Sequence, residues 1–271
     1  MPELPEVETT RRGIEPHVAG KTITRVVVRN ARLRWRVSAK LERELPGQTI
    51  LTVTRRGKYL LLATATGTLI FHLGMSGSLR VVDSMRPPDK YDHVDIVFNS
   101  GACLRMRDPR RFGAMFWVSD DPLQHKLLKH LGPEPLSADF QGDYLFEKLR
   151  GRRRAIRDAL LDGRLLAGVG NIYANEALFA AGIRPARRAG KITRIQCGRL
   201  AQAIRDTLNR AIQAGGTTLR DFRGSDGQPG YFHLSLSVYG HAGEPCPVCR
   251  TPIRAKRLGQ RTAFFCPKCQ M

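Results

Sequence analysis

The hydrophobic pattern of this 271-residue chain changes once along its length, and this change limits the folds available to it. From Lys21 to about Trp117, short runs alternate between apolar and polar residues, with turn-forming residues between the runs. Alternation with a period of two is typical of β-strands. From about Pro122 onward, apolar residues recur at spacings of three and four, as in amphipathic helices. We therefore expect a β domain, either a sandwich or a barrel, followed by a helical domain.

The individual segments can be assigned from the same pattern. The expected strands lie in "TITRVVVRN", "ARLRWRV", "TILTVTRRGKYLLLAT", "TLIFHLG", "GSLRVVD", "HVDIVFN" and "CLRMRDPRRFGAMFWV". The expected helices lie in "DPLQHKLLKHLG", "GDYLFEKLRG", "RRAIRDALLDG", "NIYANEALFAAG" and "RIQCGRLAQAIRDTLNRAIQAGG". The longest apolar stretch, "YLLLATATGTLIFHL", is interrupted at Thr66-Gly67 and is rich in β-branched residues, so it is typical of a hairpin and not of a membrane span. The glycine-rich "RGSDGQPGYF" predicts a mobile loop.

The acidic start of the chain, "MPELPEVETT", has two interpretations. A helix would explain Pro5 at its first position, and Glu6 and Glu8 where the helix dipole favours anions. This interpretation leaves Pro2 and Glu3 unexplained, because they precede the expected helix. Removal of Met1 would give Pro2 a free α-amine, whose reference pKa of about 8 leaves more of it neutral than a lysine amine. Such an amine can attack an electrophilic carbon, and a neighbouring carboxyl can transfer protons.

The charge of the chain favours a polyanionic partner. The sequence has 45 Lys+Arg and 24 Asp+Glu, for a formal net charge of +21, and residues 151–271 carry +14 of it. A basic balance of this size is typical of proteins that bind nucleic acid, although a merely soluble basic protein stays an alternative. An anionic membrane surface is a less favoured partner, because the sequence shows no strongly amphipathic basic helix. Because the N-terminus lacks the pattern of a signal peptide, we expect a soluble, cytoplasmic protein.

Four of the six cysteines have the spacing of a metal site. Cys246, Cys249, Cys266 and Cys269 form C-x2-C-x16-C-x2-C. In an intracellular protein this spacing predicts a structural zinc ion held by four thiolates, and two disulfides or redox pairs are the alternative. Four thiolates complete the coordination of zinc and leave no position for a catalytic water. The two isolated cysteines, Cys103 and Cys197, are expected to be small buried residues.

An ordered set of motifs resembles the bacterial formamidopyrimidine-DNA glycosylases over nearly the whole chain. The set is "MPELPEVETTRRGI", "GKYLLL", "HLGMSGSLR", "DHVD", "RDPRRFG", "LGPEPLS", "GVGNIYANEALF", "GGTTLRDF", "DGQPGYF", "VYGHAGEPC" and "GQRTAFFCPKC". The resemblance implies an enzyme that excises oxidised purines such as 8-oxoguanine from double-stranded DNA and then cuts the strand at the abasic site.

The resemblance also implies roles for catalytic residues. Pro2 would be the nucleophile that attacks C1′ of the damaged nucleotide, and Glu3 would transfer protons. The resulting iminium would acidify the C2′ proton and so allow strand cleavage. Lys58 would contact phosphate and serve as the proton donor for β-elimination, and Arg261 would clamp the phosphates beside the lesion and act in δ-elimination.

Further residues are expected to bind DNA. Base excision requires the target base to leave the stack, and the resemblance assigns the filling of the gap to Met75, Arg110 and Phe112. Considered alone, Met75 and Phe112 would be expected in the core. The resemblance gives His93 and Arg153 as DNA contacts, and it gives Asn171, with the backbone amides near Gly170, as a phosphate site.

The expected organisation is an α+β multidomain chain. It has a β-sandwich domain with a leading helix at residues 1–118, a linker region at 119–140, and a helix–two-turns–helix domain at 141–235. A loop near 220–232 would cover the everted base, and residues 236–271 would form the zinc finger. We expect a monomer. Two alternatives are an endonuclease VIII-like enzyme for oxidised pyrimidines and a zinc-ribbon DNA-binding protein without catalysis; "PELPEVET", the "RRF" wedge and "DGQPGYF" favour the purine enzyme.

Overall fold

The computed structural model describes residues 1–216 and 236–271. Two compact units are present in this part of the chain. The first contains Met1–Lys129 and residues 212–216, and the second contains His130–Ala211 and residues 236–271. Each unit is described below by itself. The loop predicted near 220–232 lies outside the described residues.

The first unit begins with helix α1, Leu4–Val18. Glu3 precedes it as the N-cap and forms a capping box with Glu6, a pattern that satisfies amides at a helix start. The Glu3 amide donates to the Glu6 carboxylate at 2.8 Å, and the Glu6 amide donates to the Glu3 carboxylate. The expectation that helix formation leaves Glu3 unexplained is therefore wrong. Pro5 is at the second helical position and not the first, since Leu4 begins the helix.

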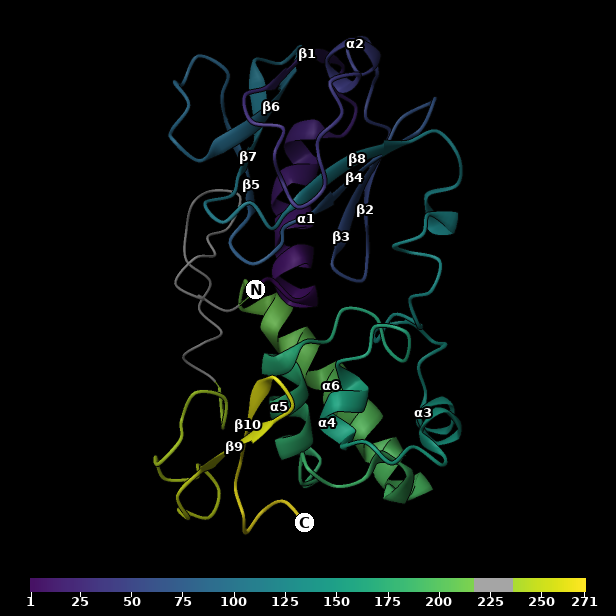
Figure 1. Ribbon diagram of the computed structural model, residues 1–271, viewed down its shortest axis with the longest axis vertical. Coiled ribbons are helices and arrows are strands. Elements are labelled where there is room, and N and C mark those ends of the chain that lie inside the picture. Colours follow the sequence, from purple (N-terminus) through teal and green to yellow (C-terminus); the bar gives the residue numbers. More distant parts are fainter. Residues whose placement is uncertain (217–235) are drawn as a thin grey trace. The chain divides into compact units, whose positions relative to one another are not determined.

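The eight strands of the first unit form two antiparallel four-stranded sheets (Figure 1), and the predicted β-sandwich is confirmed. One sheet has the order β1-β6-β7-β5 and the other β2-β3-β4-β8. The strands are β1 (Ile23–Val28), β2 (Thr52–Arg56), β3 (Tyr59–Ala63), β4 (Thr68–His72), β5 (Ser78–Asp83), β6 (Asp92–Phe98), β7 (Ala102–Arg107) and β8 (Ala114–Val118). The predicted hairpin in the longest apolar stretch is the β3–β4 pair, in which Ala63 is opposite Thr68.

One apolar core joins both sheets and α1. It includes Val26 and Ile96 from the first sheet, Leu60 from the second, and Val7 and Ile14 from α1. The helix contacts β5 and β7 of one sheet and β2 and β3 of the other. Packing of one helix against both sheets fixes the N-terminus of the chain at the end of the sandwich core.

The expected strand in "ARLRWRV" is wrong, because residues 31–37 are irregular in the structure. Leu33 and Val37 are buried, but the backbone amide of Arg34 donates to the Gly113 carbonyl and that of Val37 returns to the Ala31 carbonyl. These amides therefore have partners although the segment is not paired as a strand. A short helix, α2 (Leu41–Glu44), follows it.

The expected helix in "DPLQHKLLKHLG" is also wrong, because only the short 3-10 turn η1 (Pro122–Gln124) and a separate hydrogen-bonded turn from His125 to Lys129 form there. His125 leaves the helical region with φ −60° and ψ 138°, and its ring stacks on Phe116 of β8 at 4.8 Å. The contact with the sheet takes the chain away from the helical path that the apolar spacing suggests.

The second unit contains the four other predicted helices. They are α3 (Gly142–Leu149), α4 (Ile156–Leu160), α5 (Asn171–Ala180) and α6 (Arg194–Gln213), whose last two residues belong to the first unit, with the turn η2 (Ala189–Lys191) before α6. The C-terminal strands β9 (Arg254–Leu258) and β10 (Arg261–Phe265) form an antiparallel hairpin (Figure 1), and β10 contacts α5.

Part of the predicted linker is packed into the second unit. The amide of Gly132 donates to the Gly163 carbonyl at 2.8 Å, and Phe140 is fully buried. In the described ranges of both units, no helix has the length and apolar character that a membrane crossing requires.

Candidate functional site

The predicted nucleophile lies at the start of α1. Pro2 is buried, and the Glu3 side chain beside it is also buried. The capping box holds the Glu3 carboxylate close to the helix N-terminus, whose partial positive charge favours an anion. The helix start thus places the candidate nucleophile and a carboxyl next to each other and away from bulk water. Their catalytic roles stay predictions.

Lys58 lies in the two-residue turn that joins β2 to β3. Arg56 and Tyr59 are the last opposed pair, and Gly57 takes the first turn position with φ 56°. This conformation favours glycine. His72 of β4 is opposite Tyr59, and the two rings lie 4.8 Å apart. Burial, together with the nearby charges of Lys58 and Arg34, lowers the pKa of His72 to about 4, so the imidazole beside Lys58 is neutral near pH 7.

Two loops of the first unit bring the predicted gap-filling residues together. Met75 is 39% exposed and Phe112 is 43% exposed, so neither belongs to the core. The Arg110 guanidinium lies over the Phe112 ring, 4.9 Å from its centroid. A Cβ atom at Gly74 would lie 2.4 Å from the Phe112 carbonyl carbon, so only glycine allows this approach of the two loops. Two exposed apolar side chains and an arginine are thus presented by adjoining loops.

His93, predicted to contact DNA, is buried in the structure. Its Nε2 atom bonds the carbonyl oxygen of Asp108 at 2.8 Å. Because a carbonyl oxygen only accepts hydrogen bonds, Nε2 carries the proton. This bond ties β6 to the loop that carries Arg110 and Phe112. A direct role of His93 in DNA binding stays a prediction.

In the second unit, Asn171 begins α5 after Gly170, as predicted. Its side chain has protein partners: Nδ2 donates to the Thr262 carbonyl at 2.9 Å, and Oδ1 accepts from Arg157 at 3.2 Å. Asn171 therefore links the start of α5 to the β9–β10 hairpin. Whether it also binds phosphate is a prediction that these contacts leave open.

Arg261 is exposed at the turn of the β9–β10 hairpin, opposite Leu258. Arg157 of α4 holds this turn, because one of its terminal nitrogens donates to the carbonyls of Leu258 at 2.7 Å and Arg261 at 3.2 Å. Arg153 is exposed in the stretch before α4. Both predicted DNA-binding arginines of this unit are thus available to solvent.

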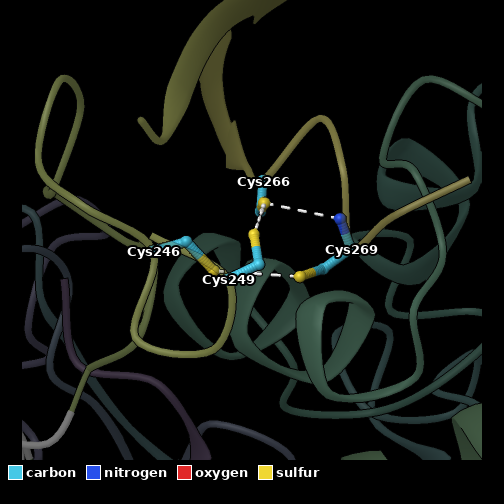
Figure 2. A group of neighbouring side chains, drawn as sticks. All are labelled: Cys246, Cys249, Cys266 and Cys269. Atoms are coloured by element: carbon cyan, nitrogen blue, oxygen red, sulfur yellow. Dashed lines mark hydrogen bonds between the residues drawn. The ribbon is translucent and has the colours of Figure 1, made fainter. Parts of the chain in front are cut away.

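The four cysteines predicted to bind zinc lie close together. Figure 2 shows their side chains in one cluster, and all four Sγ atoms lie within 4.8 Å of one another. The two C-x2-C segments make the same turn, in which the amide of Arg250 donates to the Cys246 carbonyl and that of Gln270 to the Cys266 carbonyl. The sulfurs of Cys249 and Cys266 are 3.4 Å apart, and those of Cys246 and Cys269 are 3.9 Å apart.

These distances fit a tetrahedral zinc ion. With a Zn–S bond of about 2.3 Å, the edges of a sulfur tetrahedron are about 3.8 Å long. Hydrogen bonds from Thr251 lower the pKa of the Cys249 thiol to about 6. Cys103 and Cys197 are buried as expected, and burial raises the pKa of each thiol to about 11. The cluster is therefore a structural zinc site.

Sequence reasoning missed three side chains that hold the second unit's functional segments in place. Arg157 fastens the hairpin turn, and Asn175 accepts the Phe264 amide at 2.8 Å. The buried carboxylate of Glu176 accepts the amides of Ser237, Val238 and Tyr239 at 2.8–3.0 Å. For Asn175 and Glu176 the sequence contains a signal, because apolar residues surround the expected helix "NIYANEALF", and such a helix is buried together with its polar residues.

Comparison with known protein families covers most of the chain. The formamidopyrimidine-DNA glycosylase N-terminal domain matches residues 1–115, and the H2TH domain of the same enzymes matches residues 131–223. A zinc finger found in FPG and IleRS matches residues 243–270.

Individual relatives agree with these matches over their whole lengths. The formamidopyrimidine-DNA glycosylases of Teredinibacter turnerae and Nitrosococcus oceani are 58% and 56% identical to this chain, with full coverage of both sequences. The crystal structure of the MutM (Fpg) protein of Thermus thermophilus is 42% identical, with a TM-score of 0.88 over 99% of this chain and 98% of that one. A Lactococcus lactis FPG mutant in complex with Fapy-dG-containing DNA is 35% identical, with a TM-score of 0.92 over both full chains.

The three domains match in the order in which the family has them, and the sequence identity to the relatives exceeds 50% over the full length. The β-sandwich, helix α5 and the cysteine cluster agree with these matches. The chain belongs to the formamidopyrimidine-DNA glycosylase family.

Proposed function

We propose that this enzyme removes oxidised purines from double-stranded DNA and then cleaves the strand through a covalent intermediate on Pro2. The observation that carries the proposal is the pair of exposed apolar side chains, Met75 and Phe112, held on adjoining loops with Arg110 over the Phe112 ring. Exposed large apolar residues on a strongly basic protein suit insertion between bases, where they replace an everted nucleotide.

The chemistry begins after Met1 is removed. The Pro2 nitrogen forms a bond to C1′ of the damaged nucleotide, the glycosidic bond breaks, and the base leaves with a proton. Ring opening then gives an iminium ion. Glu3, buried beside Pro2, transfers protons in these steps.

Strand cleavage uses the same intermediate. The iminium draws electrons from the sugar, so the C2′ proton can be removed and the 3′ phosphate leaves in β-elimination. Lys58, on its hairpin turn, supplies the proton for this step, and Arg261 holds the phosphates for δ-elimination at the second phosphate.

The rest of the proposed site binds DNA. Arg153, His93 and Asn171 contact the backbone, and the zinc ion keeps the hairpin with Arg261 folded. A related FPG from Lactococcus lactis has been solved with DNA that contains Fapy-dG, and a MutM with DNA that contains a carbocyclic 8-oxo-G. We propose the same lesions as substrates here, for a monomer acting on chromosomal DNA in the cytoplasm.

Borohydride trapping tests the proposal. Incubation of the protein with duplex DNA that contains 8-oxoguanine opposite cytosine, in the presence of borohydride, should give a covalent complex. An uncleaved N-terminal extension should abolish trapping and leave binding to a tetrahydrofuran abasic analogue unchanged, whereas Pro2→Gly keeps an α-amine and should retain some trapping. Trapping by the extended chain would refute the role of Pro2. Excision of oxidised pyrimidines in preference to 8-oxoguanine would assign the enzyme to the endonuclease VIII type.

A further inference from the structure

The two loops that carry Met75, Arg110 and Phe112 share a buried polar network. Asp108, at the start of the second loop, is fully buried (0% exposed). Its carboxylate accepts from both loops: Oδ1 accepts the hydroxyl of Ser76 at 2.9 Å, and Oδ2 accepts the amide of Gly113 at 2.6 Å. One buried carboxylate therefore bonds the residue after Met75 and the residue after Phe112.

Further bonds complete the network around Asp108 and Ser76. The Ser76 hydroxyl also accepts the backbone amide of Arg110 at 3.2 Å, so this hydroxyl lies between the carboxylate and the arginine loop. The Asp108 carbonyl accepts from His93 at 2.8 Å and from the amide of Arg111 at 3.2 Å. Arg111 has φ 57°. This conformation is uncommon for a residue with a side chain, so the second loop needs bonds that hold it there.

This network has a mechanical consequence for the exposed side chains. Turn bonds hold part of each loop, such as that from the Gly77 amide to the Leu73 carbonyl at 2.8 Å, but they act within one loop. Packing holds Met75 and Phe112 only in part, since they are 39% and 43% exposed. Hydrogen bonds to a buried carboxylate are strong, and their loss leaves the donors without partners. The bonds of Asp108 and Ser76 therefore join the two loops from which Met75, Arg110 and Phe112 project.

We propose that Asp108 and Ser76 are positioning residues that couple the two loops into one rigid wedge, and so determine how strongly the enzyme discriminates between bases opposite the lesion. The proposal rests on the proposed function, because it assigns the reading of the orphaned base to Arg110. A wedge with independent loops could still fill the gap left by an everted base. It could not hold the Arg110 guanidinium at a fixed place against that base, which a distinction between two bases requires.

Single-turnover kinetics test the proposal in the full-length zinc-bound enzyme. The substrates are duplexes with 8-oxoguanine opposite cytosine and opposite adenine. The readout is the rate of excision opposite cytosine divided by the rate opposite adenine. The variants are Asp108→Asn, which puts an NH2 group where an acceptor is needed, Ser76→Ala and Arg110→Ala. Ser78→Ala is the matched control, since Ser78 is a buried serine two residues further along whose side chain makes no hydrogen bond to either loop within the described residues.

Asp108→Asn and Ser76→Ala should each lower this rate ratio by about tenfold. Because the residues act through Arg110, Asp108→Asn combined with Arg110→Ala should lower the ratio no further than Arg110→Ala alone. Ser78→Ala should leave it unchanged. Borohydride trapping on single-stranded abasic DNA needs no wedge and should stay within about twofold of wild type in both positioning variants.

An unchanged ratio in Asp108→Asn and Ser76→Ala would overturn the proposal. So would an equal fall of both excision rates and of single-strand trapping, because this pattern indicates general loss of structure. If Asp108→Asn is too unstable for measurement, Ser76→Ala decides, since it removes one hydroxyl and leaves the carboxylate its Gly113 bond. Failure of the wild-type enzyme to trap abasic DNA would refute the proposed function itself.

Discussion

Arg157 offers a test of how the second unit holds the Arg261 turn. Its side chain is 1% exposed and donates to the Asn171 side chain and to the carbonyls of Leu258 and Arg261. It joins α4 both to the start of α5 and to the zinc-finger hairpin. Replacement of Arg157 by methionine keeps much of the volume and removes all of these donors.

The expected cost follows from the three hydrogen bonds. Because the donor is charged, each contributes about 1.5 kcal/mol net at the lower end of the usual range, which gives about 4.5 kcal/mol in total. Removal of a buried guanidinium returns part of its desolvation cost, and water can reach the two carbonyls at the exposed turn. The Asn171 Oδ1 atom keeps a second donor, Asn175, at 3.3 Å. We therefore expect Arg157→Met to lower the free energy of local opening of the hairpin by about 2 kcal/mol. This corresponds to roughly 30-fold faster hydrogen exchange of the hairpin amides.

Hydrogen exchange measured by mass spectrometry on peptides from residues 254–265 provides the assay. Zinc content should stay at one ion per chain, because the cysteine cluster lies at the other end of the strands. Affinity for abasic-analogue DNA should fall together with hairpin protection. Arg154→Met is the control, since Arg154 pairs with Asp162 and has no bond to the hairpin among the described residues. Unchanged exchange in residues 254–265 of Arg157→Met would refute the reasoning.

Three further predictions concern the remaining parts of the site. Arg110→Ala should weaken opposite-base discrimination, whereas Lys58→Ala should weaken binding to all DNA and reduce the salt slope by about one, as filter-binding titrations over salt concentration can show. Cys249→Ser should lose zinc by metal analysis and disorder the hairpin that carries Arg261, while circular dichroism still reports a folded β-sandwich. Because His72 has a pKa of about 4 in the folded chain against an ordinary value of about 6.5, the unfolded chain binds more protons between these values. Stability should therefore fall, by at most about 3 kcal/mol, as the pH drops from 6.5 to 4, and His72→Gln should flatten this part of the urea-unfolding profile.

Features with a local physical cause were predicted from the sequence. The β-sandwich strands, the helices α3 to α6 and the zinc site follow from residue spacing, because periodicity and C-x2-C turns act within a few residues. The start of α1 was predicted in part. Its capping box, Glu3 with Glu6, is a short local pattern in the sequence, but only Glu6 was assigned a role in the helix, and Glu3 was assigned a chemical role.

Long-range contacts decided the rest. Residues 31–37 have the composition of a strand, but Arg34 bonds Gly113, which is distant in sequence, and the segment stays irregular. Met75 and Phe112 are apolar but exposed, and they lie on loops joined by a bond between Asp108 and Ser76, which are 32 positions apart in sequence. Arg157 reaches Leu258 across 101 positions. Sequence spacing determines which faces an element can bury, whereas the partner of a buried polar group depends on which distant segments the fold brings beside it.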